Sequence, residues 1–219
     1  MPGATEVNQK YFREAYRTGL HGWETEEPSP WALAFLRKVK KRGAVPKLLD
    51  VGCGEGRHCI AARRLGFEVT GIDFQPLALA RARRFAAMRR LSGISFRRAD
   101  ILAQPFRRSS FDVVLDWGCL HHQRKTDWPS YLHELLRVLK PEGFYILSVF
   151  SPEFRYFRGS ERSWHVAYGA YRRCFTESEI RTLFCRHFEI LQIVEDRAEG
   201  RGFFHALMRR RGDDRCCLC

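Results

Sequence analysis

A glycine-rich loop between positions 50 and 56 is the segment of this sequence best suited to hold a ligand. It reads Asp-Val-Gly-Cys-Gly-Glu-Gly, follows a short apolar strand expected at 47–51, and precedes a helix expected at 56–65. Glycine has no Cβ atom, so its backbone can approach a ligand closely and adopt left-handed conformations. Unpaired N–H groups at the start of a helix favour an anionic group. The loop therefore predicts a site for a ligand with an anionic part.

The spacing of the glycines narrows the class of ligand. Dinucleotide-binding loops have the pattern Gly-x-Gly-x-x-Gly, which would place the third glycine at position 57. In this sequence Arg57 occupies that position and the third glycine is Gly56. The pattern argues against NAD and favours a single nucleoside that carries a carboxylate. A purely structural glycine-rich turn is the alternative.

Two acidic residues follow the next two expected strands. Asp73 closes the strand that begins at Phe67, and a carboxylate at that place can accept hydrogen bonds from both hydroxyls of a ribose. Asp100 follows the strand expected at 94–98 and could accept a hydrogen bond from an adenine amino group, with Ile101 packed on the ring. The alternatives are that Asp73 caps the next helix and that Asp100 forms a turn.

The segment 116–122, Asp-Trp-Gly-Cys-Leu-His-His, follows a strongly apolar strand expected at 111–116. Ligands of open α/β sheets bind beyond the carboxyl ends of the strands, so this segment should line the pocket. His121 is a candidate general base, because an imidazole titrates near neutral pH. The alternative is that His121 and His122 only shape the loop.

Alternating strands and helices must position these residues. Further strands are expected at 67–72 and 144–150, helices at 30–41, 76–91 and 129–139, and a turn at 141–143. Residues 11–16 could form a short helix. This order predicts a mostly parallel sheet covered on both faces. Beyond it, Thr176 and Glu179 form a capping box before a helix expected at 177–184, and the segments at 188–195 and 203–209 could pair as antiparallel strands.

With these motifs in place, the segment 48–150 resembles the class I S-adenosylmethionine-dependent methyltransferases. The matching pieces lie at 50–56, 71–73, 99–101, 111–116 and 139–143. The resemblance implies a single α/β domain with a Rossmann-like, doubly wound, seven-stranded sheet, mostly parallel with an antiparallel last strand. It also implies S-adenosyl-L-methionine as the cofactor.

The same resemblance implies how the cofactor is held. Gly52, Gly54 and Gly56 would approach its methionine moiety, Asp73 would hold the ribose, and Asp100 with Ile101 the adenine. The other predicted cofactor contacts in this domain are Asp50, Cys53, Phe74, Asp116 and Trp117.

A second resemblance concerns the N-terminal segment. Residues 11–30, with Tyr16 and Trp23, are similar to the start of thiopurine, thiol and tellurite-resistance methyltransferases. The similarity implies a lid in which Tyr16 or Trp23 faces the sulfonium, because an aromatic face stabilises positive charge. Ordinary aromatic packing of an N-terminal helix is the alternative. The expected organisation is a lid at 1–30, a methyltransferase domain at 31–209 with a substrate-roof insert at 151–175, and a cysteine-containing tail at 210–219.

The leading hypothesis for the acceptor is a small molecule, with a soft sulfur, selenium, tellurium or arsenic nucleophile as the favoured kind. Trp164, His165 and Arg155 in the aromatic-rich insert would contact it. One alternative is methylation of RNA or protein, since the formal net charge is +13. Methyltransferases that act on nucleic-acid bases usually carry an Asn/Asp-Pro-Pro-aromatic run after the fourth strand, and this sequence has none. The other alternative is a non-catalytic module that binds the cofactor.

Composition sets the remaining expectations. The basic residues are scattered, which is typical of a solvated surface, so nucleic acid is not the favoured partner. Apolar runs fall short of the roughly 20 residues that span a bilayer, and 1–16 has no apolar signal core, so a cytoplasmic location without membrane contact is expected. Cys216, Cys217 and Cys219 could bind a soft metal, but a frayed tail is the default and no metal site is predicted. The sequence does not indicate an oligomeric state.

Overall fold

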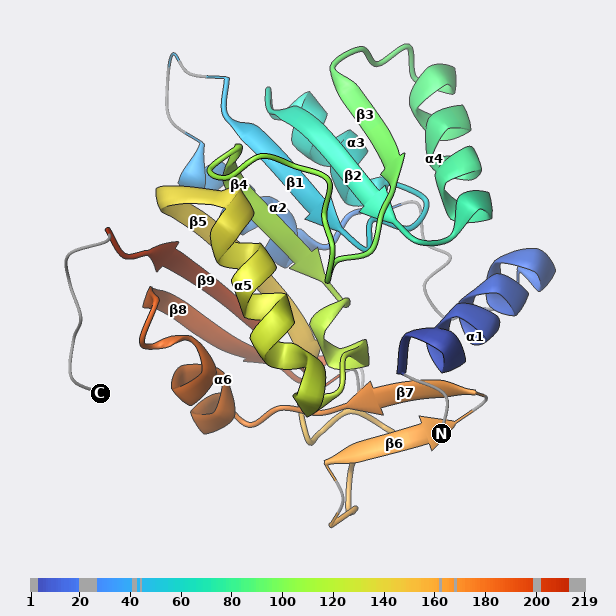
Figure 1. The fold of residues 1–219 in the computed structure, drawn as a ribbon, viewed down its shortest axis with the longest axis vertical. Helices are drawn as coiled ribbons and strands as arrows, with labels where there is room; N and C mark the ends of the chain where they lie inside the picture. Colours follow the sequence, from blue (N-terminus) through green and yellow to red (C-terminus); the bar gives the residue numbers. More distant parts are fainter. Residues whose placement is uncertain are drawn as a thin grey trace.

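A seven-stranded sheet with the order β3-β2-β1-β4-β5-β9-β8 forms the centre of the molecule (Figure 1). The computed structural model describes residues 4–19, 27–40, 43, 45–161, 163–167, 169–198 and 202–212. The strands are β1 (Lys47–Val51), β2 (Glu68–Asp73), β3 (Ile94–Arg98), β4 (Phe111–Trp117), β5 (Leu139–Phe150), β8 (Phe188–Asp196) and β9 (Phe203–Arg210). Strands β1 to β5 are parallel, whereas β9 runs antiparallel to both β5 and β8. The doubly wound sheet with a reversed last strand is confirmed, and the described elements form one α/β domain.

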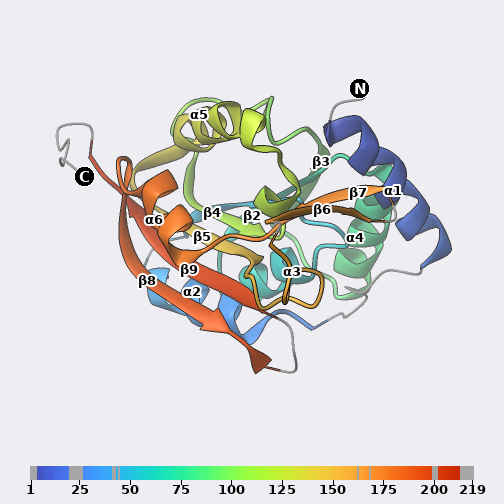
Figure 2. The ribbon, with the colours of Figure 1, turned by 90° about the horizontal axis from the view of Figure 1, so that it is seen from below.

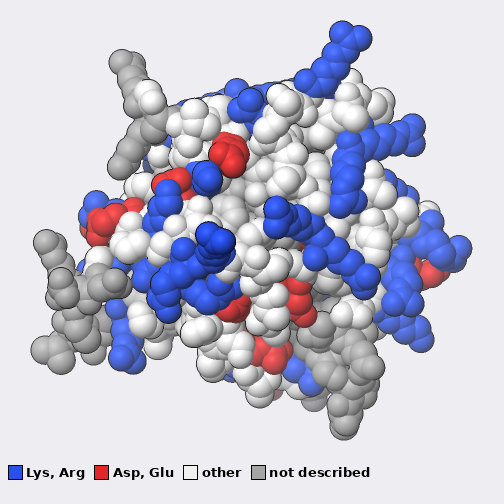
Figure 3. Space-filling view, turned by 45° about the horizontal axis from the view of Figure 1, so that its top comes forward, with Lys and Arg blue, Asp and Glu red and all other residues white. Residues whose placement is uncertain are grey.

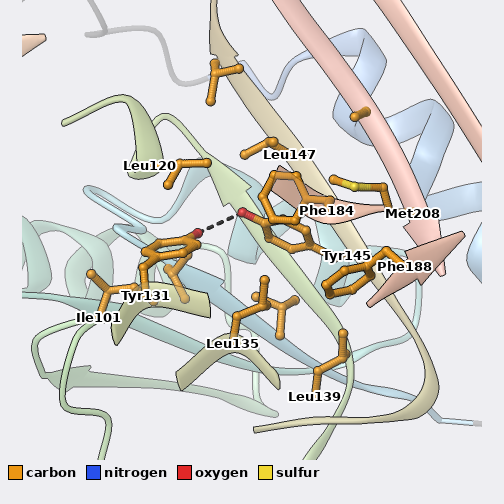
Figure 4. Close-up of a cluster of buried hydrophobic side chains, with 14 of the residues drawn as sticks. Ile101, Leu120, Tyr131, Leu135, Leu139, Tyr145, Leu147, Phe184, Phe188 and Met208 are labelled. Carbon is orange, nitrogen blue, oxygen red and sulfur yellow. Dashed lines mark hydrogen bonds between the residues drawn. The ribbon is translucent and has the colours of Figure 1, made fainter. Parts of the chain in front are cut away.

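Helices cover both faces of this sheet (Figure 2). They are α2 (Pro30–Val39), α3 (Arg57–Arg64) and α4 (Pro76–Met88) on one face, and α5 (Trp128–Val138) and α6 (Glu177–Phe184) on the other. Neighbouring strand residues alternate between the two apolar layers: Leu48 packs with α2 and α3, and Leu49 packs with α5 and α6. Both are fully buried, so β1 contributes to two cores at once. Figure 4 shows the layer beneath α5 and α6.

Most expected boundaries agree with the structure to within three residues, and two differences are larger. The turn predicted at 141–143 is an irregularity inside β5: Leu139 pairs with Phe111, and pairing resumes between Phe144 and Val113. Glu142 has a φ of 59°, which is why a strand pattern is absent there. The N-terminal helix α1 (Ala4–Thr18) is much longer than the helix expected at 11–16. The capping box of Thr176 and Glu179 is present at the start of α6.

The aromatic-rich segment after β5 contains a separate two-stranded sheet. Strands β6 (Trp164–Ala167) and β7 (Ala170–Arg173) pair as an antiparallel hairpin, which the sequence did not predict. Helix α1 lies against β7 and α4, across the end of the sheet where β1, β2 and β4 finish (Figure 1). Within the described part of the chain, no helix is both long and apolar enough to cross a membrane.

Candidate cofactor and acceptor site

The glycine loop leaves β1 in left-handed backbone conformations. The φ angles are 66° at Gly52, 54° at Gly54 and 82° at Gly56, and the last residue is the N-cap of α3. Side chains other than glycine rarely adopt such angles, so the glycine pattern is required by the path of the chain. The Cys53 backbone N–H donates to the Ile72 carbonyl at 2.9 Å and ties the loop to β2. The predicted loop thus lies beside the carboxyl end of β2.

Asp73 reaches from the end of β2 into this loop. Its two carboxylate oxygens accept hydrogen bonds from the backbone N–H groups of Gly54 at 2.9 Å and Gln75 at 2.8 Å. Burial raises the pKa of Asp73 to about 6, although both backbone N–H groups oppose that shift. The structure therefore places Asp73, the residue predicted to bind the ribose, in direct contact with the glycine loop, which is predicted to bind the methionine moiety.

Asp50 and Cys53 lie in the protein interior, at the start of the glycine loop and within it. The Asp50 carboxylate accepts a hydrogen bond from the Cys59 thiol at 3.1 Å, and both side chains are buried. Burial raises the pKa of Asp50 to about 7, while the Cys59 contact acts in the opposite direction. Cys53 is also buried, and the contact of both residues with the cofactor stays a prediction.

Asp100 and Ile101 occupy the adjacent position after β3. The Asp100 carboxylate accepts a hydrogen bond from the Leu102 N–H at 2.9 Å, which is the turn-forming arrangement given above as the alternative. Ile101 is buried in the layer under α5. Phe74, after β2, meets the ring of Phe12 from α1 edge to face at 5.7 Å. Their proposed contacts with an adenine remain a prediction.

The Asp116 side chain lies inside the protein and accepts hydrogen bonds from other buried groups. It is fully buried, and its carboxylate accepts hydrogen bonds from the backbone N–H groups of Gly118, Cys119 and Leu120 at 2.6–3.1 Å and from the Tyr131 hydroxyl. The Tyr131 hydroxyl is also 2.7 Å from that of Tyr145 (Figure 4). The side chain predicted to contact the cofactor has no exposed atom with which to do so. The two tyrosines that engage it were missed, because nothing in the sequence pairs them with Asp116.

Trp117, the next residue, packs away from the interior cluster. Its indole stacks on His205 of β9 at 4.8 Å and lies 5.3 Å from the ring of His58. The Ser148 hydroxyl is 3.1 Å from Nδ1 of His205 and fixes that ring. Trp117 therefore belongs to an aromatic group at the carboxyl end of the sheet, on the side covered by α2 and α3.

His121 is a poor general base in this geometry. Its ring stacks on Phe150 at 3.7 Å, and its Nδ1 accepts a hydrogen bond from the Phe150 N–H at 3.3 Å. Burial lowers the pKa of His121 far below the ordinary value, and the neighbouring His122 and Arg172 lower it further. The geometry favours the loop-shaping alternative.

Helix α1 is attached to both parts of the site. At one end, the Asn8 amide donates to the His122 carbonyl at 2.8 Å and accepts from the Tyr171 N–H at 2.9 Å. At the other end, Arg81 donates to the Tyr16 carbonyl at 2.8 Å and pairs with Glu55 of the loop at 2.7 Å. A Cβ atom on Gly54 would lie 2.8 Å from the Tyr16 hydroxyl. The predicted lid residue Tyr16 thus covers the glycine loop, while Trp23 lies outside the described residues.

Replacement of Asn8 by alanine is expected to loosen α1 without unfolding the domain. The two lost hydrogen bonds contribute about 1 kcal/mol each, so the open form of the helix should become roughly 30-fold more populated. Hydrogen exchange of residues 4–18, followed by mass spectrometry, measures this change. Glu14→Ala is the matched control, because Glu14 is exposed and its one ion pair among the described residues is with Arg17 of the same helix. Equal protection in both variants would contradict the assignment.

The predicted acceptor contacts lie on the hairpin and the segment before it, and all three are exposed. Trp164 stacks on Tyr171 at 6.3 Å, His165 lies 6.0 Å from Tyr156, and Arg155 covers the ring of Tyr156 at 5.0 Å. Their contact with an acceptor remains a prediction.

A buried arginine on the inner side of the hairpin was missed. Arg172 is only 5% exposed, and its guanidinium lies over the rings of Tyr11 at 4.9 Å and Tyr156 at 5.4 Å. The sequence offered no means of separating it from the exposed Arg155, because its burial depends on tertiary contacts such as that with Tyr11 of α1.

The glycine loop, the carboxylate at the end of β2 and the sheet with one reversed strand together define the class. These are the features of a class I S-adenosylmethionine-dependent methyltransferase domain, whose cofactor is S-adenosyl-L-methionine. A family model described as a methyltransferase domain matches residues 48–143.

Curated relatives agree with this assignment. The chain is 28% identical over 153 residues to a 2-heptyl-1-hydroxyquinolin-4(1H)-one methyltransferase of Mycobacteroides abscessus, a match that covers 67% of this chain and 66% of that protein. It is 36% identical over 105 residues to the chloroplastic tocopherol O-methyltransferase of Arabidopsis thaliana, covering 47% and 30%. These matches span two thirds or less of the relatives' own lengths.

A solved structure is similar over nearly the whole chain. It is the 1,6-didemethyltoxoflavin-N1-methyltransferase of Burkholderia thailandensis with bound 1,6-didemethyltoxoflavin and S-adenosylhomocysteine. The TM-score is 0.79 at 25% identity, and the match covers 97% of this chain and 92% of that one. The similarity therefore includes α1 and the hairpin as well as the central domain.

Proposed function

We propose that this protein transfers the methyl group of S-adenosylmethionine to a small, planar acceptor held between α1 and the β6–β7 hairpin. The observation that carries the proposal is the double attachment of α1. Asn8 joins it to the hairpin and to the segment after β4, and Arg81 and Glu55 join it to the glycine loop. One helix thus borders the cofactor loop and the place beyond β4 where the methyl group would leave.

The residues of the candidate site suit a reaction whose rate depends on the alignment of the methyl donor with the acceptor. Methyl transfer is a displacement at a carbon that the sulfonium of the cofactor already activates, and alignment of the two reactants can supply roughly 7–11 kcal/mol. Burial lowers the pKa of His122 to about 4 and the pKa of His121 well below its ordinary value, so both rings are neutral at pH 7. An acceptor that already carries a lone pair on an oxygen, nitrogen or sulfur atom fits such a site.

Arg172 supports an acceptor with delocalised negative charge. The Arg172 guanidinium lies over the rings of Tyr11 and Tyr156 and donates to the Ala170 carbonyl at 3.5 Å. A guanidinium has five N–H donors in a fixed plane, so it can bind a carbonyl or an oxyanion in addition to its protein partners. The two relatives named for a hydroxyquinolone and a didemethyltoxoflavin act on fused heteroaromatic rings. We therefore favour an anionic heteroaromatic acceptor, with soft sulfur, selenium, tellurium or arsenic nucleophiles as the second choice.

Methylation of nucleic acid is less favoured. On the face shown in Figure 3, Lys and Arg side chains occur in several separate groups, with acidic and uncharged residues between them. Some basic residues of the described chain are paired with acids, as in Lys140 with Asp112 at 2.8 Å. A nucleic-acid footprint would require a continuous basic track.

Transfer of a labelled methyl group from S-adenosylmethionine tests the proposal. The acceptors would be a 1-hydroxyquinolone, a pteridine-like heterocycle, an aliphatic thiol, arsenite, tellurite and total RNA, with the Asp73→Ala variant as background. Label in a heterocycle is the expected result. Label only in RNA would replace the proposed acceptor class. Tight binding of the cofactor without transfer to any acceptor would favour a non-catalytic module.

A further inference from the structure

The neighbouring rings of His121 and His122 carry their protons on opposite nitrogen atoms. Burial lowers the pKa of both residues, to about 4 in His122 and well below the ordinary value in His121, so each ring is neutral at pH 7 and holds one proton. The Phe150 N–H donates to Nδ1 of His121 at 3.3 Å, which leaves the His121 proton on Nε2. Nδ1 of His122 is 2.7 Å from the Tyr171 carbonyl oxygen, which can only accept, so the His122 proton lies on Nδ1. Nε2 is therefore a hydrogen-bond donor in His121 and an acceptor in His122.

This donor and this acceptor lie close together in the segment after β4. The two rings meet edge to face, with centroids 4.5 Å apart. A Cβ atom on Gly118 would lie 3.5 Å from Nε2 of His121, so the glycine leaves that side of the donor without a side chain. Phe12 of α1 meets the His122 ring edge to face at 5.0 Å. The pair thus lies beside α1, where the methyl acceptor is proposed to bind.

Both Nε2 atoms need partners. Among the residues that the structure describes, neither atom makes a hydrogen bond, whereas Nδ1 of each ring does. His121 is only 4% exposed, and its ring stacks on Phe150 at 3.7 Å. A polar atom in such apolar surroundings costs free energy unless a hydrogen bond satisfies it. A carbonyl group next to a ring N–H has the complementary pattern, since it offers an acceptor beside a donor.

We propose that His121 and His122 together recognise an acceptor whose ring carries a carbonyl group next to an N–H group. The His121 Nε2–H donates to the carbonyl oxygen, and Nε2 of His122 accepts from the ring N–H. Held by this edge, the ring presents one particular atom to the methyl group, so the two histidines are positioning residues that take no proton from the acceptor. This inference rests on the proposed function, because it presupposes an acceptor beside α1.

Nitrogen-15 NMR of the imidazole rings tests the proton positions without any acceptor. At pH 7 we expect a protonated Nε2 in His121 and a protonated Nδ1 in His122. The loss of signals in His121→Phe and His122→Phe assigns the two rings. Protons on the same nitrogen in both rings, or a charged ring, would overturn the inference.

Two heterocyclic probes then test the recognition itself. Lumazine, a pteridine dione, has ring N–H groups beside its carbonyls, whereas dimethyllumazine keeps the carbonyls and has both N–H groups methylated. Isothermal titration calorimetry would measure both dissociation constants with the protein saturated by S-adenosylhomocysteine. The variants are His121→Phe and His122→Phe, which keep a planar ring and remove its nitrogen atoms. His133→Phe is the matched control, because His133 is an exposed histidine of α5.

The expected losses differ between the two histidines. His122→Phe should weaken lumazine by about 3- to 10-fold, the range for one hydrogen bond, and change dimethyllumazine by less than about twofold. His121→Phe should weaken both probes by about 3- to 10-fold, because both keep the carbonyl. In the wild type, lumazine should also shift the Nε2 signals of both rings. His133→Phe should leave both constants within about twofold of the wild type.

The remaining outcomes count against the inference. An equal loss for both probes in His122→Phe, or no loss for lumazine, would overturn it. Failure of the wild type to bind lumazine would also overturn it, whereas the proposed function would fall only if the transfer experiment left every heterocycle unlabelled. Thermal unfolding checks that each variant keeps its fold, and His122→Phe with the NMR measurement carries the test if His121→Phe does not fold.

Discussion

Replacement of Asp73 by alanine is expected to weaken S-adenosylhomocysteine by at least about 100-fold, since hydrogen bonds to a charged group contribute roughly 1.5–3 kcal/mol each and a ribose offers two. The same change removes the acceptor for the Gly54 and Gln75 N–H groups, so the glycine loop also loses its attachment to β2. Titration calorimetry measures the loss. Glu68→Ala is the control, because Glu68 is an exposed acid at the opposite end of the same strand. A loss of less than fivefold in Asp73→Ala would contradict the proposed site.

The pH dependence gives this prediction a second measurement. Burial raises the pKa of Asp73 to about 6 in the protein without cofactor, so the carboxylate is ionised at pH 8 and largely protonated at pH 5. Ribose hydroxyls donate to the ionised form, and affinity should therefore fall as the pH drops through 6. Asp50, with a pKa of about 7, titrates nearby. The Asp73→Asn variant separates the effects of Asp73 and Asp50. Its plot of affinity against pH should lose the change near pH 6 and keep any change near pH 7.

Replacement of Asp116 by alanine should produce the largest loss of stability among these variants. Three backbone N–H groups and the Tyr131 hydroxyl lose their acceptor inside the protein, and buried donors left without partners cost about 1–3 kcal/mol each. With partial rearrangement, we expect a loss of about 3 kcal/mol or more in the free energy of unfolding. Urea unfolding at pH 7 measures it. Asp116→Asn keeps one acceptor oxygen and should be intermediate.

The same variant tests the direction in which the free energy of unfolding changes with pH. Burial raises the pKa of Asp116 to about 6, above that of an unfolded chain, so protonation stabilises the folded form as the pH falls. The difference in stability between wild type and Asp116→Ala should therefore be larger at pH 5 than at pH 8. A difference below about 1 kcal/mol at both pH values would show that the buried contacts contribute little.

The sequence predicted the central sheet well because its strands carry local information. In β4, apolar residues from Val113 to Leu115 are buried from both sides, and such a run resembles nothing but a strand or a buried helix. The hairpin of β6 and β7 lacked this signal. Trp164 and Val166 are about half exposed, so hydrophobic character and burial do not coincide there.

Expectations about the local structure of the site agree with the fold where backbone geometry decides the residue type, while the contacts of these residues with the cofactor stay predictions. The glycine loop and Asp73 were placed together because a left-handed turn and a strand end restrict what fits. Asp116 looked like the same kind of acid, yet its partners Tyr131 and Tyr145 come from elements that only the fold brings near. Arg155 and Arg172 were likewise indistinguishable, although one is exposed and the other buried.

Helix α1 has a consequence for how the two reactants influence one another. It contacts the hairpin and the segment after β4 through Asn8, and it reaches the glycine loop through Tyr16 and α4 through the hydrogen bond with Arg81. In the proposed site, this one helix is therefore shared by the binding equilibria of the acceptor and the cofactor. If one reactant spends binding free energy to hold α1 in place, the other reactant no longer has to supply that free energy when it binds. Thermodynamic linkage requires the two effects to be equal. An acceptor that raises the affinity for the cofactor tenfold must itself bind ten times more tightly to the protein that already holds the cofactor.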